Sequence, residues 1–268
     1  MKIPYELIKV AIYASIKAGN AILKIYKTDF SVENKIDNSP LTIADKKSHI
    51  IIRDELLSTN LPILSEEGIE IPFDKRKNWK RFWMVDPLDG TKEFIKRNDE
   101  FTVNIALIEN NYPIGGVIFL PVLDVLYFAF DGIGSFKLKN VSKNYFPNIE
   151  ILELINKSKK LPLKIKKETF TIIASRSHLS DETEDFIKKL KDKHRKVELI
   201  SRGSSLKFCV IAEGTADIYP RHAPTMEWDT AAGQAIVEIA GGKVINNNQN
   251  RIKYNKPNLL NPWFIVKF

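Results

Sequence analysis

Apolar residues follow two different periods along this chain, and each period predicts its own kind of element. From Tyr5 to Tyr26 they recur at close to a helical spacing, which predicts an amphipathic helix covering one face of a sheet. A second run with the same period begins after Thr42 and continues to Leu57, so we expect a second helix there. Beyond it, apolar residues alternate with polar ones or form short continuous runs, as strands do.

Short strands joined by tight turns are expected in the rest of the first half. The expected strands are residues 62–65, 81–85, 101–108, 115–119 and 125–130. Asn110-Asn111 and Asp131-Gly132 lie between expected strands, and such pairs favour hairpin turns. We therefore predict an antiparallel sheet and an α+β lobe.

Strands and helices are expected to alternate in the second half. The expected strands are residues 170–174, 197–200, 216–219 and 243–245, and the expected helices are 181–191, 205–213 and 230–240. Such alternation is typical of an α/β lobe. The overall prediction is a layered α+β / α/β sandwich, with an N-terminal antiparallel-sheet lobe at 1–140, a Lys-rich junction at 141–168 and a C-terminal α/β lobe at 169–268.

Composition narrows the class of protein. With 268 residues and 44% hydrophobic content, the chain is long enough to bury a sizeable core. The longest apolar stretch, 117–130, is interrupted by Pro121 and Asp124 and is too short to span a bilayer, and no secretory signal is visible at the start. The single cysteine, Cys209, excludes an internal disulfide and a Cys-based zinc site. These features predict a cytoplasmic protein.

The net charge of +8 and the pI near 9.3 favour anionic partners, whether nucleotides, nucleic acid or a membrane surface. Much of the positive charge lies in residues 157–167 and 188–196, where it is more typical of solvated faces than of a binding patch. A nucleic-acid or membrane-surface binding protein is therefore the distant alternative.

The strongest chemical signal is the segment Trp83-Met84-Val85-Asp86-Pro87-Leu88-Asp89-Gly90-Thr91-Lys92. The apolar start is typical of the end of a buried strand, Pro87 stiffens the backbone between the acids, and Gly90 permits a sharp turn before a helix. Asp86, Asp89 and the Leu88 carbonyl would then face one point, as oxygen ligands of Mg²⁺ do. Backbone N–H groups after Gly90 would favour an anion. A surface turn is the alternative, because Asp-Pro and Asp-Gly pairs also form turns.

Four other acids stand at ends of expected elements and can join such a site: Asp45, Glu66, Glu67 and Asp229. Asp45 and Asp229 have a competing role as helix caps, since Thr42-x-x-Asp45 resembles a capping box and Asp229 precedes a run of small residues. The adjacent pair Glu66-Glu67 does not reveal which acid would coordinate. His49, His178, His194 and His222 show no metal-ligand spacing, so we expect no histidine-based metal site.

These residues together resemble the inositol monophosphatase superfamily of Mg²⁺-dependent phosphatases. The motifs that carry the resemblance are Ser39-Pro40-x-Thr42-x-Ala44-Asp45, Ser65-Glu66-Glu67, Trp83-x-Val85-Asp86-Pro87-Leu88-Asp89-Gly90-Thr91-Lys92-Glu93-Phe94, Phe101-Thr102-x-Asn104-x-Ala106-Leu107 and Trp228-Asp229-x-Ala231-Ala232-Gly233. The chain is most similar to the CysQ-type 3′(2′),5′-bisphosphate nucleotidases. That narrower likeness rests on Thr91-Lys92-Glu93-Phe94, Tyr219-Pro220-Arg221 and Ser204-Ser205-x-Lys207.

The resemblance implies a layered sandwich of the sugar-phosphatase type and a site with two or three Mg²⁺ ions. The implied metal ligands are Glu66, Asp86, the Leu88 carbonyl, Asp89 and Asp229. Asp45 and Thr91 would be catalytic, polarising a water molecule for in-line attack on phosphorus. No covalent intermediate is required.

The implied reaction is removal of the 3′-phosphate of adenosine 3′,5′-bisphosphate to give AMP and phosphate, in sulfur metabolism. The implied substrate-binding residues are Glu66, Leu88, Asp89, Gly90, Thr91, Ser175, His178, Ser205, Lys207, Arg221 and Asp229. An inositol monophosphatase or fructose-1,6-bisphosphatase would share the metal ligands and is the alternative within the superfamily. Peripheral attachment to the inner face of the cell membrane is compatible with this chemistry.

Overall fold

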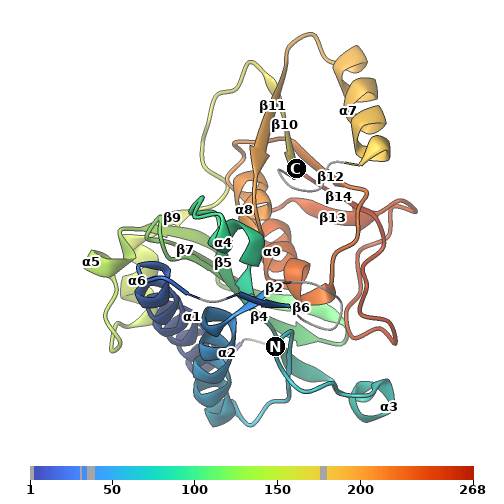
Figure 1. Ribbon diagram of the computed structural model, residues 1–268. Coiled ribbons are helices and arrows are strands. Elements are labelled where there is room, and N and C mark those ends of the chain that lie inside the picture. The colour runs from blue at the N-terminus through green and yellow to red at the C-terminus, as the bar shows by residue number, and fades with distance from the viewer. Residues whose placement is uncertain (1–2, 31, 35–39, 176–179) are drawn as a thin grey trace.

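The computed structural model describes residues 3–30, 32–34, 40–175 and 180–268, and it consists of two large sheets with helices on their faces and between them (Figure 1). The layered sandwich expected from the sequence is confirmed. Within the described residues, none of the helices combines the length and the apolar content needed to cross a membrane.

The first sheet has seven strands in the order β3-β4-β5-β6-β7-β8-β9. They are β3 (Ile63–Ser65), β4 (Arg81–Asp89), β5 (Thr102–Glu109), β6 (Tyr112–Leu120), β7 (Val125–Phe130), β8 (Gly134–Lys139) and β9 (Lys159–Lys160). Strands β4 to β9 pair antiparallel with their neighbours, whereas β3 joins β4 in parallel. The antiparallel pairing was predicted, but β8 and β9 were not among the expected strands. Tight turns at Asn110-Asn111 and at Gly132 join two of the hairpins, with positive φ at all three residues.

Side chains of this sheet alternate between two hydrophobic layers. On β4, Trp83 and Val85 pack with α1 (Tyr5–Tyr26) and α2 (Ile43–Leu56), which cover one face. Phe82 and Met84 point to the other face, against helices from the second half of the chain. Because both faces are buried, the central strands are almost continuously apolar.

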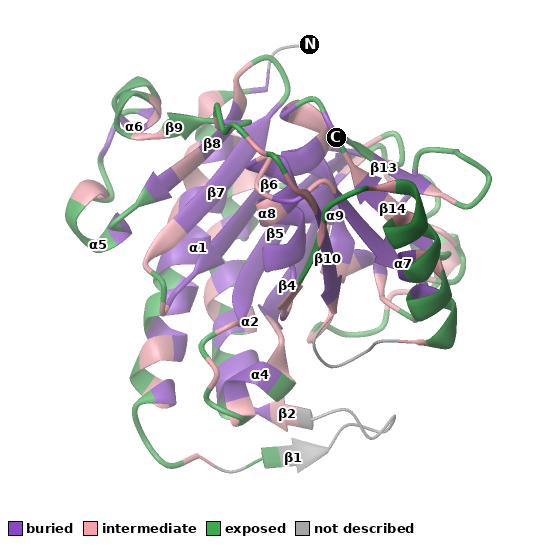
Figure 2. Ribbon diagram, turned by 90° about the horizontal axis from the view of Figure 1, so that it is seen from above, coloured by how far each residue is buried: buried purple, intermediate pink, exposed green. Residues whose placement is uncertain are grey.

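The second sheet has five strands in the order β11-β10-β12-β14-β13. They are β10 (Phe170–Ser175), β11 (Val197–Arg202), β12 (Ile218–Arg221), β13 (Lys243–Asn246) and β14 (Phe264–Lys267). Helices α8 (Leu206–Ala212) and α9 (Glu227–Ile239) lie between the two sheets, and α7 (Asp181–Lys193) packs on the outer face. Figure 2 shows the contrast, with α9 largely buried and α7 largely exposed.

Small residues let α9 approach the first sheet closely. A Cβ atom at Gly116 of β6 would lie 2.5 Å from the Ala232 carbonyl oxygen of α9, so a larger residue would separate the two elements. The small residues that follow Asp229 on α9 allow this close approach. It also fixes where the first turn of α9 lies relative to β4 and β5.

The Lys-rich stretch between the halves is structured and belongs with the first sheet. It contains α5 (Val141–Asn144), α6 (Ile151–Lys157) and strand β9, which pairs with β8. Leu154 of α6 is fully buried in the same layer as α1. The remaining short elements are β1 (Val32–Asn34), β2 (Pro40–Thr42), the 3-10 turn η1 (Leu57–Thr59), α3 (Phe73–Arg76) and α4 (Thr91–Ile95).

Candidate active site

Strand β4 carries Asp86 and Asp89 at the centre of the molecule. The prediction that this strand ends at Val85 is wrong, because both aspartates still pair with β5 and the strand continues to Asp89. The pairing register shifts between the two aspartates, which is a bulge that lets the strand bend where Pro87 interrupts its N–H groups. The Ser48 hydroxyl donates to the Pro87 carbonyl at 2.7 Å and holds this bend against α2.

Gly90 makes the sharp turn that follows. Its φ of +94° lies in the left-handed region, and α4 begins at the next residue. A Cβ atom there would lie 3.2 Å from the Glu100 carbonyl oxygen and 3.3 Å from Ser204 Cβ. Glycine therefore satisfies both the backbone conformation and the crowding at this point.

Three carboxylates from distant parts of the chain meet beside this bend. Glu66 follows β3, Asp86 lies in β4 and Asp229 lies in the first turn of α9. Each offers an oxygen atom within 4.8 Å of the others, a spacing that would let one cation bind all three. Of the adjacent pair Glu66-Glu67, the structure brings Glu66 into this group.

Burial and repulsion from neighbouring carboxylates make Asp86 and Asp229 hard to ionise without a cation, and burial does the same to Asp89. Burial and the nearby Glu66, Asp89 and Asp229 carboxylates raise the pKa of Asp86 well above its usual range. Burial, with Asp89 and Glu66, does the same to the pKa of Asp229. Burial raises the pKa of Asp89 to about 6, against the opposing effect of the Lys207 ammonium. A divalent cation would offset both causes, so this donor set fits Mg²⁺.

Asp45 combines the cap of α2 with a hydrogen bond to Thr91. Its Oδ2 accepts hydrogen bonds from the Thr42 N–H at 2.8 Å and the Thr42 hydroxyl at 2.6 Å, which completes the capping box of α2. Its Oδ1 accepts the Thr91 hydroxyl at 3.1 Å. The carboxylate is buried, and this burial, with the nearby Glu66 carboxylate, raises its pKa against the opposing hydrogen bonds from Thr42 and Thr91.

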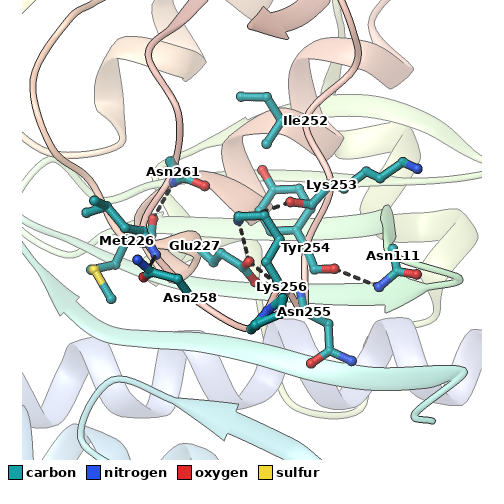
Figure 3. Close-up of polar contacts among 12 residues, drawn as sticks. Asn111, Met226, Glu227, Ile252, Lys253, Tyr254, Asn255, Lys256, Asn258 and Asn261 are labelled. Carbon is teal, nitrogen blue, oxygen red and sulfur yellow. Dashed lines mark hydrogen bonds and ion pairs between the residues drawn. The ribbon is translucent and has the colours of Figure 1, made fainter. Parts of the chain in front are cut away.

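Asp229 likewise combines capping with a place in the acid cluster. Its Oδ2 accepts the Met226 N–H at 2.8 Å, as a residue in the first turn of a helix can. The start of α9 is itself held by a C-terminal segment, shown in Figure 3. There the fully buried Glu227 accepts the Asn255 N–H at 2.6 Å and the Lys256 N–H at 3.0 Å, and pairs with the Lys256 ammonium.

A cavity of about 260 Å³ opens beside the acids and reaches into the second half. Its lining includes Glu66, Asp89, Gly90, Thr91, Ser175, Ser204, Ser205, Lys207, Arg221 and Asp229. The structure therefore brings most of the expected site residues to one cavity, whose lining combines carboxylates with the cations Lys92, Lys207 and Arg221. We call the carboxylates its acidic end and the buried Lys207 and Arg221 its basic end. Asp45 and Asp86 are buried beside these carboxylates, and so is Leu88 between Asp86 and Asp89.

Lys207 and Arg221 form the basic end. The Lys207 ammonium donates to the Ser204 carbonyl at 2.6 Å, and its burial lowers its pKa from 10.5 to about 8. Arg221 is also buried, and one of its terminal nitrogens donates to the Pro224 carbonyl at 3.0 Å. Its Nε atom has no hydrogen-bond partner among the described residues. The positive charges of Lys207 and Arg221 in this lining suit an anionic group.

Two serines line this cavity. The Ser204 hydroxyl is buried and has no hydrogen-bond partner among the described residues, and its backbone has a φ of +44°. The Ser205 hydroxyl forms hydrogen bonds with Thr102 and Asn104, and its expected contact with substrate stays a prediction. Ser204, Thr102 and Asn104 belong to the motifs named in the sequence, but no role was predicted for them. His178 lies outside the described residues.

Comparisons with known proteins agree with this geometry. The chain matches the model of the Inositol monophosphatase family over residues 4–263. It is 42% identical over 258 residues to 3′(2′),5′-bisphosphate nucleotidase CysQ of Shigella flexneri, covering 93% of this chain and 94% of that protein.

The fold is also similar to solved structures. The crystal structure of CysQ from Bacteroides thetaiotaomicron, a bacterial member of the inositol monophosphatase family, matches with a TM-score of 0.89 and 51% identity, covering 96% of this chain and 95% of that chain. Extragenic suppressor protein suhB from Bartonella henselae has a TM-score of 0.72 at 25% identity, covering 97% of this chain and 92% of its own. The chain therefore belongs to the inositol monophosphatase family.

Proposed function

We propose that this chain is a Mg²⁺-dependent 3′(2′),5′-bisphosphate nucleotidase that converts adenosine 3′,5′-bisphosphate to AMP and phosphate. The observation that carries the proposal is one cavity lined both by carboxylates and by the buried cations Lys207 and Arg221. A substrate with two phosphates would place the scissile one among the acids and the second one against the cations. The similarity to proteins named 3′(2′),5′-bisphosphate nucleotidase supports the same substrate class.

The acidic end suits metal-assisted hydrolysis. Glu66, Asp86, Asp89, Asp229 and the Leu88 carbonyl would hold the metal, because they offer the oxygen ligands that Mg²⁺ prefers. When bound, Mg²⁺ would neutralise the oxygens of the transferred phosphoryl group and make water easier to deprotonate. We propose that two or three Mg²⁺ ions bind there, as the resemblance to the inositol monophosphatase family implies.

Thr91 and Asp45 provide a path for the proton of the attacking water. The Thr91 hydroxyl donates to Asp45 Oδ1, so its oxygen keeps a lone pair that can accept a hydrogen bond from water. As water attacks phosphorus, its proton would pass to the Thr91 oxygen while the Thr91 proton passes to Asp45 Oδ1. The raised pKa of Asp45 makes it a better acceptor of that proton.

The basic end would recognise the 5′-phosphate and the nucleoside. Arg221 and Lys207 offer positive charge, and Ser204 lines the same cavity. Ser175 lines the same cavity at the end of β10. We propose that these four side chains contact the nucleotide, and that the scissile phosphate lies near Gly90 and Thr91.

A substrate panel tests this proposal. We expect the purified protein with Mg²⁺ to hydrolyse adenosine 3′,5′-bisphosphate with a higher kcat/KM than inositol 1-phosphate or fructose 1,6-bisphosphate. Removing the metal with EDTA should abolish hydrolysis, and adding Mg²⁺ should restore it. A clear preference for either sugar phosphate would overturn the proposed substrate and leave the phosphatase chemistry in place.

A cytoplasmic location follows as part of the proposal. Cys209 is a free, buried thiol, which suits a reducing compartment without requiring one. The nucleotide product of sulfur transfer reactions would also be formed there. Fractionation of cells that express the tagged protein would test this expectation, and recovery with the membrane fraction would contradict it.

A further inference from the structure

Three buried polar side chains meet directly behind Asp89. They are Thr102 and Asn104 of β5 and Ser205 from the turn before α8, and their exposed fractions are 0%, 1% and 2%. The first two face the bend of β4 from within the first sheet. Ser205 reaches the same point from the second half of the chain.

All three side chains are connected to each other by hydrogen bonds. The Ser205 hydroxyl lies 2.8 Å from the Thr102 hydroxyl and 2.8 Å from Asn104 Oδ1. The Thr102 hydroxyl also lies 3.0 Å from Asn104 Oδ1. With a hydroxyl so engaged and so little exposed, Ser205 has little capacity left for a nucleotide.

The same group fixes one oxygen of Asp89. Asp89 Oδ2 accepts the Ser205 backbone N–H, the Asn104 amide at 3.3 Å and the Thr102 hydroxyl at 3.5 Å. These donors come from two elements that are far apart in sequence. Because Oδ2 is occupied in this way, the carboxylate can turn only its other oxygen toward the cavity.

The turn that carries Ser205 is itself docked on the first half. The Gly203 N–H donates to Glu100 Oε2 at 2.6 Å, and a Cβ atom at Gly203 would lie 2.7 Å from Glu93 Cγ. The position of Asp89 therefore depends on contact between the two halves of the molecule at this turn. Buried networks of this kind are rigid when every member is satisfied.

We propose that Thr102, Asn104 and Ser205 are positioning residues, which hold Asp89 in the orientation that binds the metal and make metal affinity depend on the docking of the second half. This inference rests on the proposed role of Asp89 as a metal ligand. It also gives a reason for the Phe101-Thr102-x-Asn104 motif, whose polar members form hydrogen bonds with Asp89 and Ser205. Residues that orient a metal ligand commonly contribute about 10- to 100-fold to metal affinity.

The test measures Mn²⁺ affinity by calorimetry on the full chain without substrate, in Ser205→Ala, Thr102→Val and the double variant. We expect each single variant to weaken Mn²⁺ binding about tenfold, and the double variant to weaken it by less than the product of the two effects, because both hydroxyls belong to one network. Thr102→Ser keeps the hydroxyl and should bind Mn²⁺ as the wild type does.

Ser135→Ala is the matched control. The Ser135 hydroxyl is also buried and also joins the first sheet to the second half, donating to the Ile236 carbonyl of α9 at 3.0 Å, but it does not line the cavity. It should lower the melting temperature without changing Mn²⁺ affinity. Wild-type Mn²⁺ affinity in Ser205→Ala, with a raised KM for nucleotide, would overturn the proposal and make Ser205 a substrate contact. Because no substrate is present, the affinity result is independent of which phosphate ester the enzyme hydrolyses.

Discussion

The two ends of the cavity are built in different ways. Three of the residues at the acidic end, Asp86, Leu88 and Asp89, lie within four positions of one strand and its bend, whereas Asp45, Glu66 and Asp229 come from other elements. The basic end has no such segment, since Lys207 lies in α8 and Arg221 ends β12. Chemistry that is shared across a superfamily is thus concentrated in one segment, while recognition of the second phosphate depends on side chains that only the fold brings together.

The first prediction removes the acidic end alone. Asp86→Asn should lower kcat at least about 10³-fold, because it takes a charge from the centre of the cluster that would hold the metal. The thermal stabilisation that Mg²⁺ gives the wild type should also be lost. Asp131→Asn, at an exposed hairpin turn, should keep both activity and the metal-dependent shift. Activity within tenfold of wild type in Asp86→Asn would remove the acidic end from the mechanism.

The second prediction removes the basic end alone. Arg221→Met should raise KM for adenosine 3′,5′-bisphosphate about 10- to 100-fold, the usual effect of losing a hydrogen bond to a charged group. It should leave KM for adenosine 3′-monophosphate, which lacks the second phosphate, within about threefold of wild type. Steady-state kinetics on the two nucleotides separate these outcomes. An equal rise in KM for both nucleotides would indicate that Arg221 supports the fold of the cavity and does not bind the second phosphate.

The third prediction uses pH to switch the charge of Lys207. Its pKa is lowered from 10.5 to about 8, so the ammonium is charged below pH 8 and loses its proton as pH rises through that value. If the charged form binds the second phosphate, KM for the bisphosphate should rise by up to about tenfold per pH unit above pH 8. The monophosphate should show no such rise. In Lys207→Met the two nucleotides should share one pH profile, and a persisting difference would assign the titration to another group.

The fourth prediction concerns the anchoring of Asp229. Glu227 lies two residues before Asp229, and Glu227→Gln removes its buried charge, which pairs with Lys256. We therefore expect kcat to fall about three- to tenfold. The free energy of unfolding should fall by about 1–3 kcal/mol. Glu238→Gln is the matched control, because Glu238 lies on the same helix and pairs with Arg251 near its other end. That variant should lose stability but keep kcat. Equal kcat values in both variants would show that the contact between Glu227 and Lys256 has no effect on catalysis.

The sequence could predict the acidic end because its signals are local. Pro87 and Gly90 indicate the bend and the turn beside the two aspartates, and Thr42-x-x-Asp45 indicates the helix cap. It could not show that Asp45 uses one oxygen for the cap and the other for Thr91, because Thr91 approaches through tertiary packing. The same limit explains Ser205, whose hydroxyl is engaged by two residues of β5 that lie about a hundred positions earlier.

The fold was predictable to a similar extent and for the same reason. Helices α1 and α2 and most central strands have complete periodic patterns, and they were expected close to their observed bounds. Strand β9 has only Lys159 and Lys160, whose side chains give no strand signal, and exists because it pairs with β8. Strand β14 inserts between β12 and β13, an order that local pattern cannot reveal. The sequence thus missed β9, which depends on a partner distant in the chain, and it also missed β8, which pairs with the adjacent β7.

One ratio tests the two-ended cavity most directly. It is kcat/KM for adenosine 3′,5′-bisphosphate divided by kcat/KM for adenosine 3′-monophosphate, measured on the wild-type protein with Mg²⁺ at pH 7. Two buried cations against the second phosphate predict a ratio of about 100 or more. A ratio near one, with both nucleotides hydrolysed, would contradict the account, because the basic end would then have no part in choosing the substrate.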